Sequence, residues 1–479
     1  MSGCIQPARR VRVLGLISVG ALYLAMFAGR FSLERFAIWP EYVPAPDLRA
    51  IGILIAAIIY VVFFRATVLP QPRIVRPAWL FFLVVSLFYG YVVLNALLWG
   101  ASGQVQLVVA DALATMAALM LAAFLLSRRE WLDDFARVSQ AFGVLLALLA
   151  ASGMGNPDLN GVGWAPIGGP ISFYRLEFFA ACASLYLMLR SGHVTWRVFH
   201  FACALLALYA TLASLSKAAL LGMIVALALI FVVWYLRRYF RHIIFLVIAV
   251  FIVGTVFQLT KGALMQSRIT VGITPTVIAE SFGDEDLLMG DLVISYRGDM
   301  DYEMLPDHQK RRLKALSELF HDAGAPDYRQ DPAALVRWAA RFVLLSDGSN
   351  RIGMAQNALK AFRERPLTGI GPGRYAYWTI NPYKLEPEQY SYPHNIVLEV
   401  LSVTGLVGFV LFSWSVFIGY VSAVRTQWAW DESLPFIAYS VFVAVTALFS
   451  GDLYDFRLFW FSLMMVLVFS GVSKSPDSD

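Results

Sequence analysis

The residues best suited to chemistry lie in the last third of the chain, within and just after its only long polar segment. Arg351 stands in the first turn of a predicted helix, and His394 lies where a long apolar run begins. Arginine offers a permanently charged fork for phosphate or carboxylate, and helix N-termini also favour anions. Histidine accepts a proton near neutral pH, and the positive end of a helix disfavours its charged form. The pattern indicates chemistry at a membrane surface.

Other charged candidates flank the long apolar runs. Arg268 follows the ninth run by a few residues, and Arg297 lies farther along the same polar segment. Arg175 and Lys217 lie near the ends of the sixth and eighth runs, where an ionisable group is a functional hypothesis by default. Each of the four is a candidate to bind an anionic group. The alternative is a side chain that only extends to the membrane–water boundary.

Three small or amide residues complete the candidate site. Gly371 and Gly373 belong to the run Gly369-Ile-Gly-Pro-Gly373, and glycines let a backbone approach a phosphate closely. Turn geometry explains these glycines equally well. Asn395 follows His394 and either contacts the substrate or caps the next helix.

Composition places these residues in a membrane protein. The chain has 479 residues, of which 59% are hydrophobic and 15% are charged, against roughly 25% charged in soluble domains. About twelve apolar runs are long enough to span a bilayer as helices, so we predict an all-α, polytopic fold. The predicted spans are 12–29, 48–64, 78–98, 107–126, 135–151, 172–189, 197–213, 218–236, 242–258, 396–424, 433–450 and 457–472.

Charge patterning predicts the orientation. Arginines recur in alternate loops, which places both termini in the cytoplasm and the segment 259–395 outside. The predicted parts are therefore 1–258 with nine helices, 259–395 as an outward domain, and 396–479 with three helices. The same loop arginines account for the net charge of +5 without a nucleic-acid partner. We interpret the first run as an uncleaved helix, although its basic start is similar to a signal peptide.

The outward segment has helical periodicity but no metal-binding or nucleotide motif. Helices are predicted over 309–321, 331–345 and 350–365, the last ended by Pro366. Phosphate loops and HExxH or CxxC spacings do not occur in the sequence. The acidic run Asp284-Glu-Asp286 lacks calcium-loop spacing and favours a solvated surface over a cation site. We therefore expect activity without metal or cofactor.

Several of these pieces together resemble one family. The outward segment and the helix after it resemble those of the O-antigen ligase and polymerase superfamily, and so does a short motif at the start of the eighth span. The matching motifs are Ser349-Asn-Arg-Ile352, Arg365-Pro-Leu-Thr-Gly-Ile-Gly-Pro-Gly373, Pro393-His-Asn395 with Leu398-Glu399, Gly405-Leu-Val-Gly408 and Leu215-Ser-Lys-Ala218.

The resemblance implies a GT-C-like glycosyltransferase of the bacterial inner membrane. Such enzymes pass a glycan en bloc from a polyprenyl (undecaprenyl) diphosphate carrier to a sugar hydroxyl on the periplasmic face, without metal or nucleotide sugar. His394 would be the general base, and Arg351 with Arg268 would compensate the diphosphate charge, with Arg297 as the rival of Arg268. The substrate-binding candidates are Lys217, Arg175, Arg297, Asn395, Gly371 and Gly373.

Four functions remain open at this point. A ligase that attaches polysaccharide to a lipid or core-oligosaccharide acceptor comes first, and a polymerase that extends carrier-linked repeat units comes second. A transporter for lipid-linked oligosaccharides would favour charges near the bilayer midplane, whereas the charges here gather near the outer boundary. The fourth is an inert assembly scaffold, which activity of the purified protein would exclude.

The orientation gives the first testable prediction. Reporter fusions at positions 129 and 238 should give a cytoplasmic signal, and a fusion at position 300 a periplasmic one, because basic loops remain inside. A cytoplasmic signal at position 300 would put the candidate site on the wrong side of the membrane for this chemistry.

Overall fold

A computed structural model describes residues 5–27, 48–65, 76–100, 102–151, 156–157, 163–164, 170–214, 216–271, 351–375, 393–426, 430–450, 453 and 456–472. The helices are α1 (Ile5–Phe27), α2 (Leu48–Arg65), α3 (Arg76–Trp99), α4 (Ser102–Leu125), α5 (Arg129–Ala151), α6 (Pro170–Arg190), α7 (Val194–Ala213), α8 (Lys217–Leu236), α9 (Phe240–Val271), α14 (Arg351–Glu364), α15 (Ile396–Thr426), α16 (Trp430–Ser450) and α17 (Arg457–Val472). Two antiparallel two-residue strands, β1 (Asn156–Pro157) and β2 (Gly163–Trp164), lie between α5 and α6.

The predicted all-α, polytopic membrane fold is confirmed. Every predicted span coincides with a helix, namely α1 to α9 and α15 to α17. In the part that the structure describes, seven of these helices are long and apolar enough to cross a membrane, and α1, α2 and α17 contain shorter apolar stretches. The predicted helix 350–365 is observed as α14. The predicted helices 309–321 and 331–345 lie outside the described residues.

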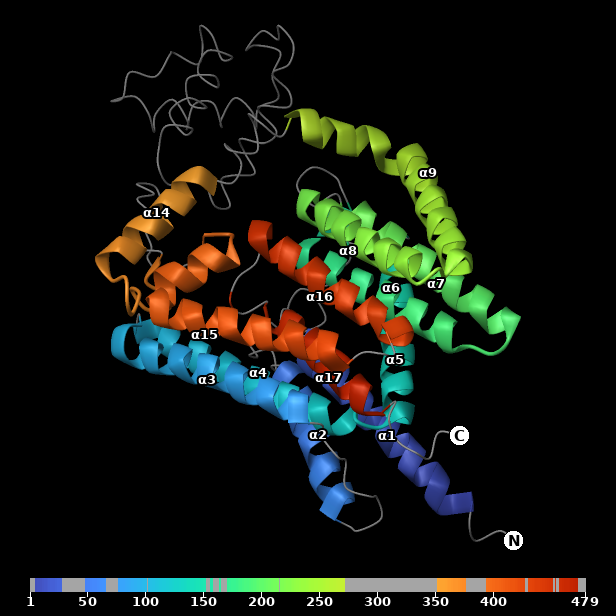
Figure 1. The fold of residues 1–479 in the computed structure, drawn as a ribbon, viewed down its shortest axis with the longest axis horizontal. Coiled ribbons are helices and arrows are strands. Elements are labelled where there is room, and N and C mark those ends of the chain that lie inside the picture. Colours follow the sequence, from blue (N-terminus) through green and yellow to red (C-terminus); the bar gives the residue numbers. More distant parts are fainter. Residues whose placement is uncertain are drawn as a thin grey trace, which may run out of the picture.

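Helix α9 is longer than predicted. Its membrane-compatible part is Phe240–Thr260, close to the predicted span 242–258, but the helix continues to Val271. Figure 1 shows α9 running beside α7 and then bending over the bundle. The predicted domain boundary at residue 258 therefore falls inside this helix, and Arg268 is helical.

Helix α6 is the centre of the bundle. Every side chain from Phe173 to Met188 is buried, and the helix packs against α5, α7, α8 and α16 (Figure 1). Aromatic rings fill the contact with α16: Phe178 stacks on Phe442 with ring centroids 4.1 Å apart. Because no face of α6 meets lipid, the helix can carry charged residues that a lipid-facing span would exclude.

An ionic network fastens one end of this core. Arg190 at the end of α6 donates to Asp133 of α5 at 3.2 Å and lies 3.6 Å from Glu432 of α16. Glu432 also accepts from Arg129 at the start of α5, at 3.1 Å. The network joins α5, α6 and α16 at the end of the bundle where α6 ends and α16 begins.

Helix α15 is broken at Gly405, which has φ 66° and ψ −166°. The segment 366–371, just after α14, enters the break and binds both sides of it. The backbone bonds run from Ile370 N–H to the Ser402 carbonyl (2.9 Å), Gly371 N–H to Val403 (3.0 Å), Leu406 N–H to Pro366 (2.8 Å) and Val407 N–H to Leu367 (3.2 Å). These bonds replace those that a continuous helix would make, so the break leaves these groups paired.

Glycine is required on both sides of this junction. Gly369 has φ 70°, and a Cβ built there would lie 2.3 Å from the Val403 carbonyl oxygen. A Cβ on Gly405 would lie 2.5 Å from the Leu367 carbonyl oxygen. Both obstacles are backbone atoms, which cannot rotate away as a flexible side chain can. The glycine motif therefore lets two backbones pack in direct contact.

This junction predicts a stability defect. Gly369→Ala should destabilise the protein by about 2–5 kcal/mol, from left-handed strain plus overpacking. The matched control is Gly90→Ala in α3, where an added Cβ meets nothing within 4 Å. That change should be neutral or stabilise the helix by about 0.5–1 kcal/mol. Thermal unfolding of both variants in detergent would measure the difference, and equal midpoints would contradict the role of the junction.

Candidate active site

Several elements that carry predicted site residues, namely the starts of α8 and α15 and the glycine segment 366–371, lie at one end of the bundle. Asn395 of the α15 start donates to the Leu448 carbonyl near the end of α16, at 2.9 Å. The start of α8 lies beside the same stretch of α16, because a Cβ on Gly222 would lie 2.8 Å from the Thr446 side chain. Residues 366–371 of the junction contact the end of α3, since a Cβ on Gly371 would lie 2.2 Å from the Trp99 carbonyl oxygen. We call this end of the bundle the site end.

His394 has an unusual backbone conformation. Its φ of 52° lies in the left-handed region, which non-glycine residues rarely adopt, and its side chain is half-buried. Such conformations persist where the surrounding structure holds them, and they cluster at active sites. The residue directly precedes the cap of α15. The local fold thus places His394 at the N-terminal end of α15.

Asn395 holds that turn in place. Its Oδ1 accepts from the N–H groups of Val397 and Leu398 at 3.0 and 3.1 Å, which is the N-cap arrangement. Its Nδ2 donates to the Leu448 carbonyl. The capping alternative for Asn395 is therefore observed. This amide ties the start of α15 to the end of α16 and so positions His394.

Glu399 belongs to the family motif that follows His394, but the sequence assigned it no role. It is 3% exposed, and its Oε2 accepts from the Leu453 N–H at 2.9 Å, between α16 and α17. Burial and the Glu399 charge raise the pKa of the Tyr375 phenol. The phenol therefore stays protonated and donates to the Met354 carbonyl of α14 at 2.6 Å. Glu399 and Tyr375 thus connect α14, the glycine segment and the first turn of α15.

The glycine segment lies between these helices and α3. Gly371 and Gly373 have φ values of 92° and 77°. The Cα of Gly371 faces the backbone of Trp99, so close packing accounts for this glycine. Beside it, the Arg365 guanidinium lies 4.5 Å from the centre of the Trp99 ring, a cation–π contact. Substrate contact by Gly371 and Gly373 stays a prediction.

Three of the predicted cationic residues are placed by their backbone alone. Arg351 is the first residue of α14, Lys217 the first of α8, and Arg268 lies in the last turns of α9. Helix starts favour anions, so Arg351 and Lys217 occupy positions suited to phosphate. Arg297 lies outside the described residues.

Arg175 is buried in the bundle core. It is 1% exposed on α6, and its guanidinium lies 6.0 Å from the centre of the Tyr174 ring. It therefore does not extend to the lipid boundary. Glu177 lies two residues farther along α6 and is also fully buried. Its Oε2 faces α5, because a Cβ built on Gly143 would lie 3.5 Å from it. Two ionisable side chains at membrane depth make the α6 start a functional candidate.

A second charge cluster lies among α1, α2, α4 and α17. Asp111 of α4 bonds Arg49 of α2 and lies 3.7 Å from Arg457 at the start of α17. Arg457 also donates from Nε to the Met26 carbonyl of α1 at 3.2 Å. Sequence spacing does not reveal this cluster, because its members come from four distant helices. The cluster joins four helices. Lipid tails have no hydrogen-bonding groups, so they do not compete for these polar contacts.

The described part of the chain contains no group of three or more His, Cys, Asp or Glu that could hold a metal. The acidic residues 284–286 lie outside that part, so metal independence stays a prediction.

The Glu399 contact generates a prediction for this end of the bundle. Glu399→Ala should destabilise the protein by about 1–3 kcal/mol, because it leaves the buried Leu453 N–H without its acceptor. Glu399→Gln keeps an acceptor oxygen and should retain most of the stability. Glu364→Ala, at an exposed position of α14, is the control. Thermal unfolding midpoints would decide, and an alanine variant as stable as the glutamine variant would refute the contact.

Comparison with known proteins agrees with the motifs. Residues 202–413 match the model of the O-antigen ligase family. The matched region includes every predicted site residue except Arg175. A comparison with curated proteins returned no match. The predicted superfamily is thereby confirmed, and residues 202–413 of this membrane protein belong to the O-antigen ligase family.

Proposed function

We propose that this protein transfers a glycan en bloc from a polyprenyl (undecaprenyl) diphosphate carrier to a sugar hydroxyl, as a ligase of the O-antigen type. The reaction would take place on the periplasmic face of the bacterial inner membrane, in a GT-C-like fold. The observation that carries the proposal is His394, held in a left-handed turn at the start of α15 beside α14, inside the family segment.

In the proposed reaction the acceptor hydroxyl oxygen attacks the anomeric carbon of the glycan. The new C–O bond forms as the bond to the carrier diphosphate breaks, and His394 takes the hydroxyl proton. The polyprenyl diphosphate leaves with the bonding electron pair. General-base assistance of this kind contributes about 10²- to 10⁴-fold. Asn395 would act through the turn that it caps.

The departing diphosphate needs positive charge beside it. Arg351 and Arg268 are proposed to supply this charge. A guanidinium group stays protonated and can donate two parallel hydrogen bonds to phosphate oxygens. Fixed charges of this kind are often the largest catalytic contribution. Arg175 and Lys217 are proposed to bind the carrier-linked glycan substrate deeper in the membrane. Arg297 remains the alternative to Arg268.

The polymerase differs from the ligase only in its acceptor. A transporter gains little support from the broken α15, because segment 366–371 already binds groups on both sides of the break. In transporters with broken transmembrane helices, the unpaired backbone groups at the break instead bind the substrate or the coupling ion. The buried charges of α6 are the feature that would favour transport.

The test uses purified protein, a polyprenyl-diphosphate-linked glycan and a lipid-linked sugar acceptor. Wild-type protein should attach the glycan to the acceptor, whereas longer carrier-linked chains would identify a polymerase. His394→Ala and His394→Gln should both lower turnover by about 10²-fold or more with donor affinity retained, because neither accepts a proton at neutral pH.

Donor affinity, turnover and thermal midpoint would be measured for both His394 variants. An active glutamine variant together with a destabilised alanine variant would assign His394 a structural role. Absence of any glycan transfer by the folded wild type would refute the proposal and leave the transporter and scaffold alternatives.

A further inference from the structure

Helix α3 packs along α15 and presents three residues to the junction from a single face (Figure 1). Tyr91, Asn95 and Trp99 are spaced by four residues, which places them on one side of the helix over about 12 Å. We call these three residues the α3 stripe. Each of them contacts a different part of the junction.

The first two residues of the stripe donate to backbone carbonyls. The Tyr91 hydroxyl donates to the Thr404 carbonyl at 3.1 Å, directly before the break at Gly405. The Asn95 Nδ2 donates to the Thr368 carbonyl in the glycine segment. Since Asn95 is only 2% exposed, loss of its amide would leave that carbonyl without a replacement partner from water.

The third residue of the stripe contacts the glycine segment through its ring and through its backbone. The Arg365 guanidinium lies 4.5 Å from the centre of the Trp99 ring. The Trp99 carbonyl oxygen lies so close to Gly371 that an added Cβ would be 2.2 Å from it. Together with the Asn95 bond, these contacts hold segment 365–371 at its start, middle and end.

The polypeptide that the stripe holds has a small apolar cluster of its own. Ala358 and Ala361 of α14 pack with Ile370 and Tyr375, apart from the main core of the bundle. Leu398, in the first turn of α15, packs against this cluster. The α3 stripe therefore links α14 and the glycine segment to the bundle through contacts that the main core does not provide.

The break also changes what orients the first half of α15, residues 396–404, which follows His394. A continuous helix keeps its direction through its own backbone bonds, but at Gly405 these are replaced by bonds to segment 366–371. At its start, the half-helix is tied to α16 by the bond from Asn395 to the Leu448 carbonyl. At its end, it is held by the α3 stripe and the glycine segment. The orientation of the half-helix thus depends on α3 as well as on α16.

We propose that Tyr91, Asn95 and Trp99 are positioning residues, which orient the half-helix and so set the place of His394 in the site. This inference rests on the proposed glycan transfer. The stripe would act through the backbone that it holds and would not touch the substrate. Misplacement of a reacting group by about 1 Å can lower a rate by about 10²-fold. Changes in the stripe should therefore lower turnover more than donor binding.

The test measures donor affinity, turnover and thermal midpoint in the purified full chain. Tyr91→Phe, Asn95→Ala and Trp99→Leu should each lower turnover by about 10- to 100-fold, with donor affinity within about twofold of wild type. Trp99→Phe keeps a ring face for Arg365 and should restore most of the turnover. If Asn95→Ala fails to fold, Tyr91→Phe still tests the stripe, because it removes only a hydroxyl. Wild-type turnover in folded Tyr91→Phe and Trp99→Leu would overturn the proposal.

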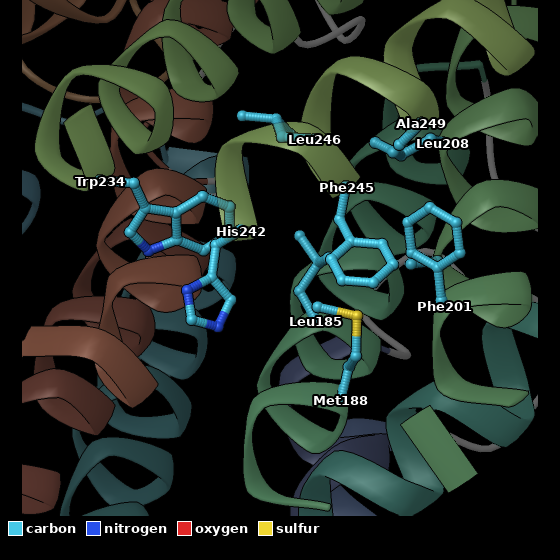
Figure 2. A pocket seen from close by; sticks show the side chains of 10 residues that line it. Leu185, Met188, Phe201, Leu208, Trp234, His242, Phe245, Leu246 and Ala249 are labelled. Carbon is cyan, nitrogen blue, oxygen red and sulfur yellow. The ribbon is translucent and has the colours of Figure 1, made fainter. Parts of the chain in front are cut away.

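Two control variants separate position from stability. Leu94→Ala changes a residue of α3 that is 51% exposed, and it should leave turnover unchanged. Leu246→Ala removes buried volume beside a small apolar hollow among α6, α7, α8 and α9, near the end of α8 that lies away from the site end (Figure 2). It should lower the thermal midpoint without changing the turnover of folded protein. A loss of turnover in Leu246→Ala equal to that of the stripe variants would mean that activity follows stability, which would overturn the proposal.

A double-variant cycle tests whether the stripe acts through His394. In the His394→Ala background, Tyr91→Phe should lower the residual turnover by less than about twofold, because the group that it positions is already absent. A loss as large as in the wild-type background would show that Tyr91 acts elsewhere and would overturn the proposal.

Hydrogen exchange separates this inference from the proposed function. The N–H groups of Ile370, Gly371, Leu406 and Val407 are bonded across the junction, so peptides that contain them should exchange about tenfold faster in Asn95→Ala than in wild type. Unchanged exchange with an active wild type would overturn the positioning role alone. Absence of glycan transfer by the folded wild type would overturn both the proposed function and the positioning role.

Discussion

A bilayer offers no water to an unpaired backbone group, and this constraint explains the arrangement of the site end. Helix α15 breaks at Gly405, and the break is stable because segment 366–371 supplies donors and acceptors to both halves. Since that segment follows α14 directly, the same bonds fix α14 against the first turn of α15. The left-handed turn at His394, the Asn395 cap and the Glu399 contact all lie on the short half-helix that this junction holds.

Local sequence signals predicted the helices well and their long-range contacts poorly. Apolar length located the spans, and periodicity followed by Pro366 located α14, because both depend on neighbouring residues. The break in α15 was not predicted, since Gly405 lies in an apolar run like other small residues of membrane helices. The backbone groups that pair across the break belong to residues 366–371, more than 30 residues earlier in the sequence. The extension of α9 was not predicted, because the apolar run ends near Thr260 while the helix continues to Val271.

The candidate site shows the same division. His394, Arg351 and Asn395 were identifiable because they adjoin helix starts, where residue type and position have a direct physical meaning. Glu177 and the Asp111 cluster were not, and Glu399 was noted only as part of the motif, because a charge in an apolar run gives no indication of its partner on another helix. Their roles depend on which helices meet, and this information is distributed over the whole chain.

The complete burial of α6 has a consequence for biosynthesis. A helix that carries Arg175 and Glu177 gains little from lipid, and each such charge costs about 2.5–3.5 kcal/mol at the centre of an inserting helix. Its partner α16 is among the last helices to leave the ribosome, more than 200 residues later. The nascent chain must therefore hold α6 among α5, α7 and α8 until α16 arrives and closes the core. Ribosome-bound intermediates that lack α16 are the stage at which quality-control proteases can recognise this protein.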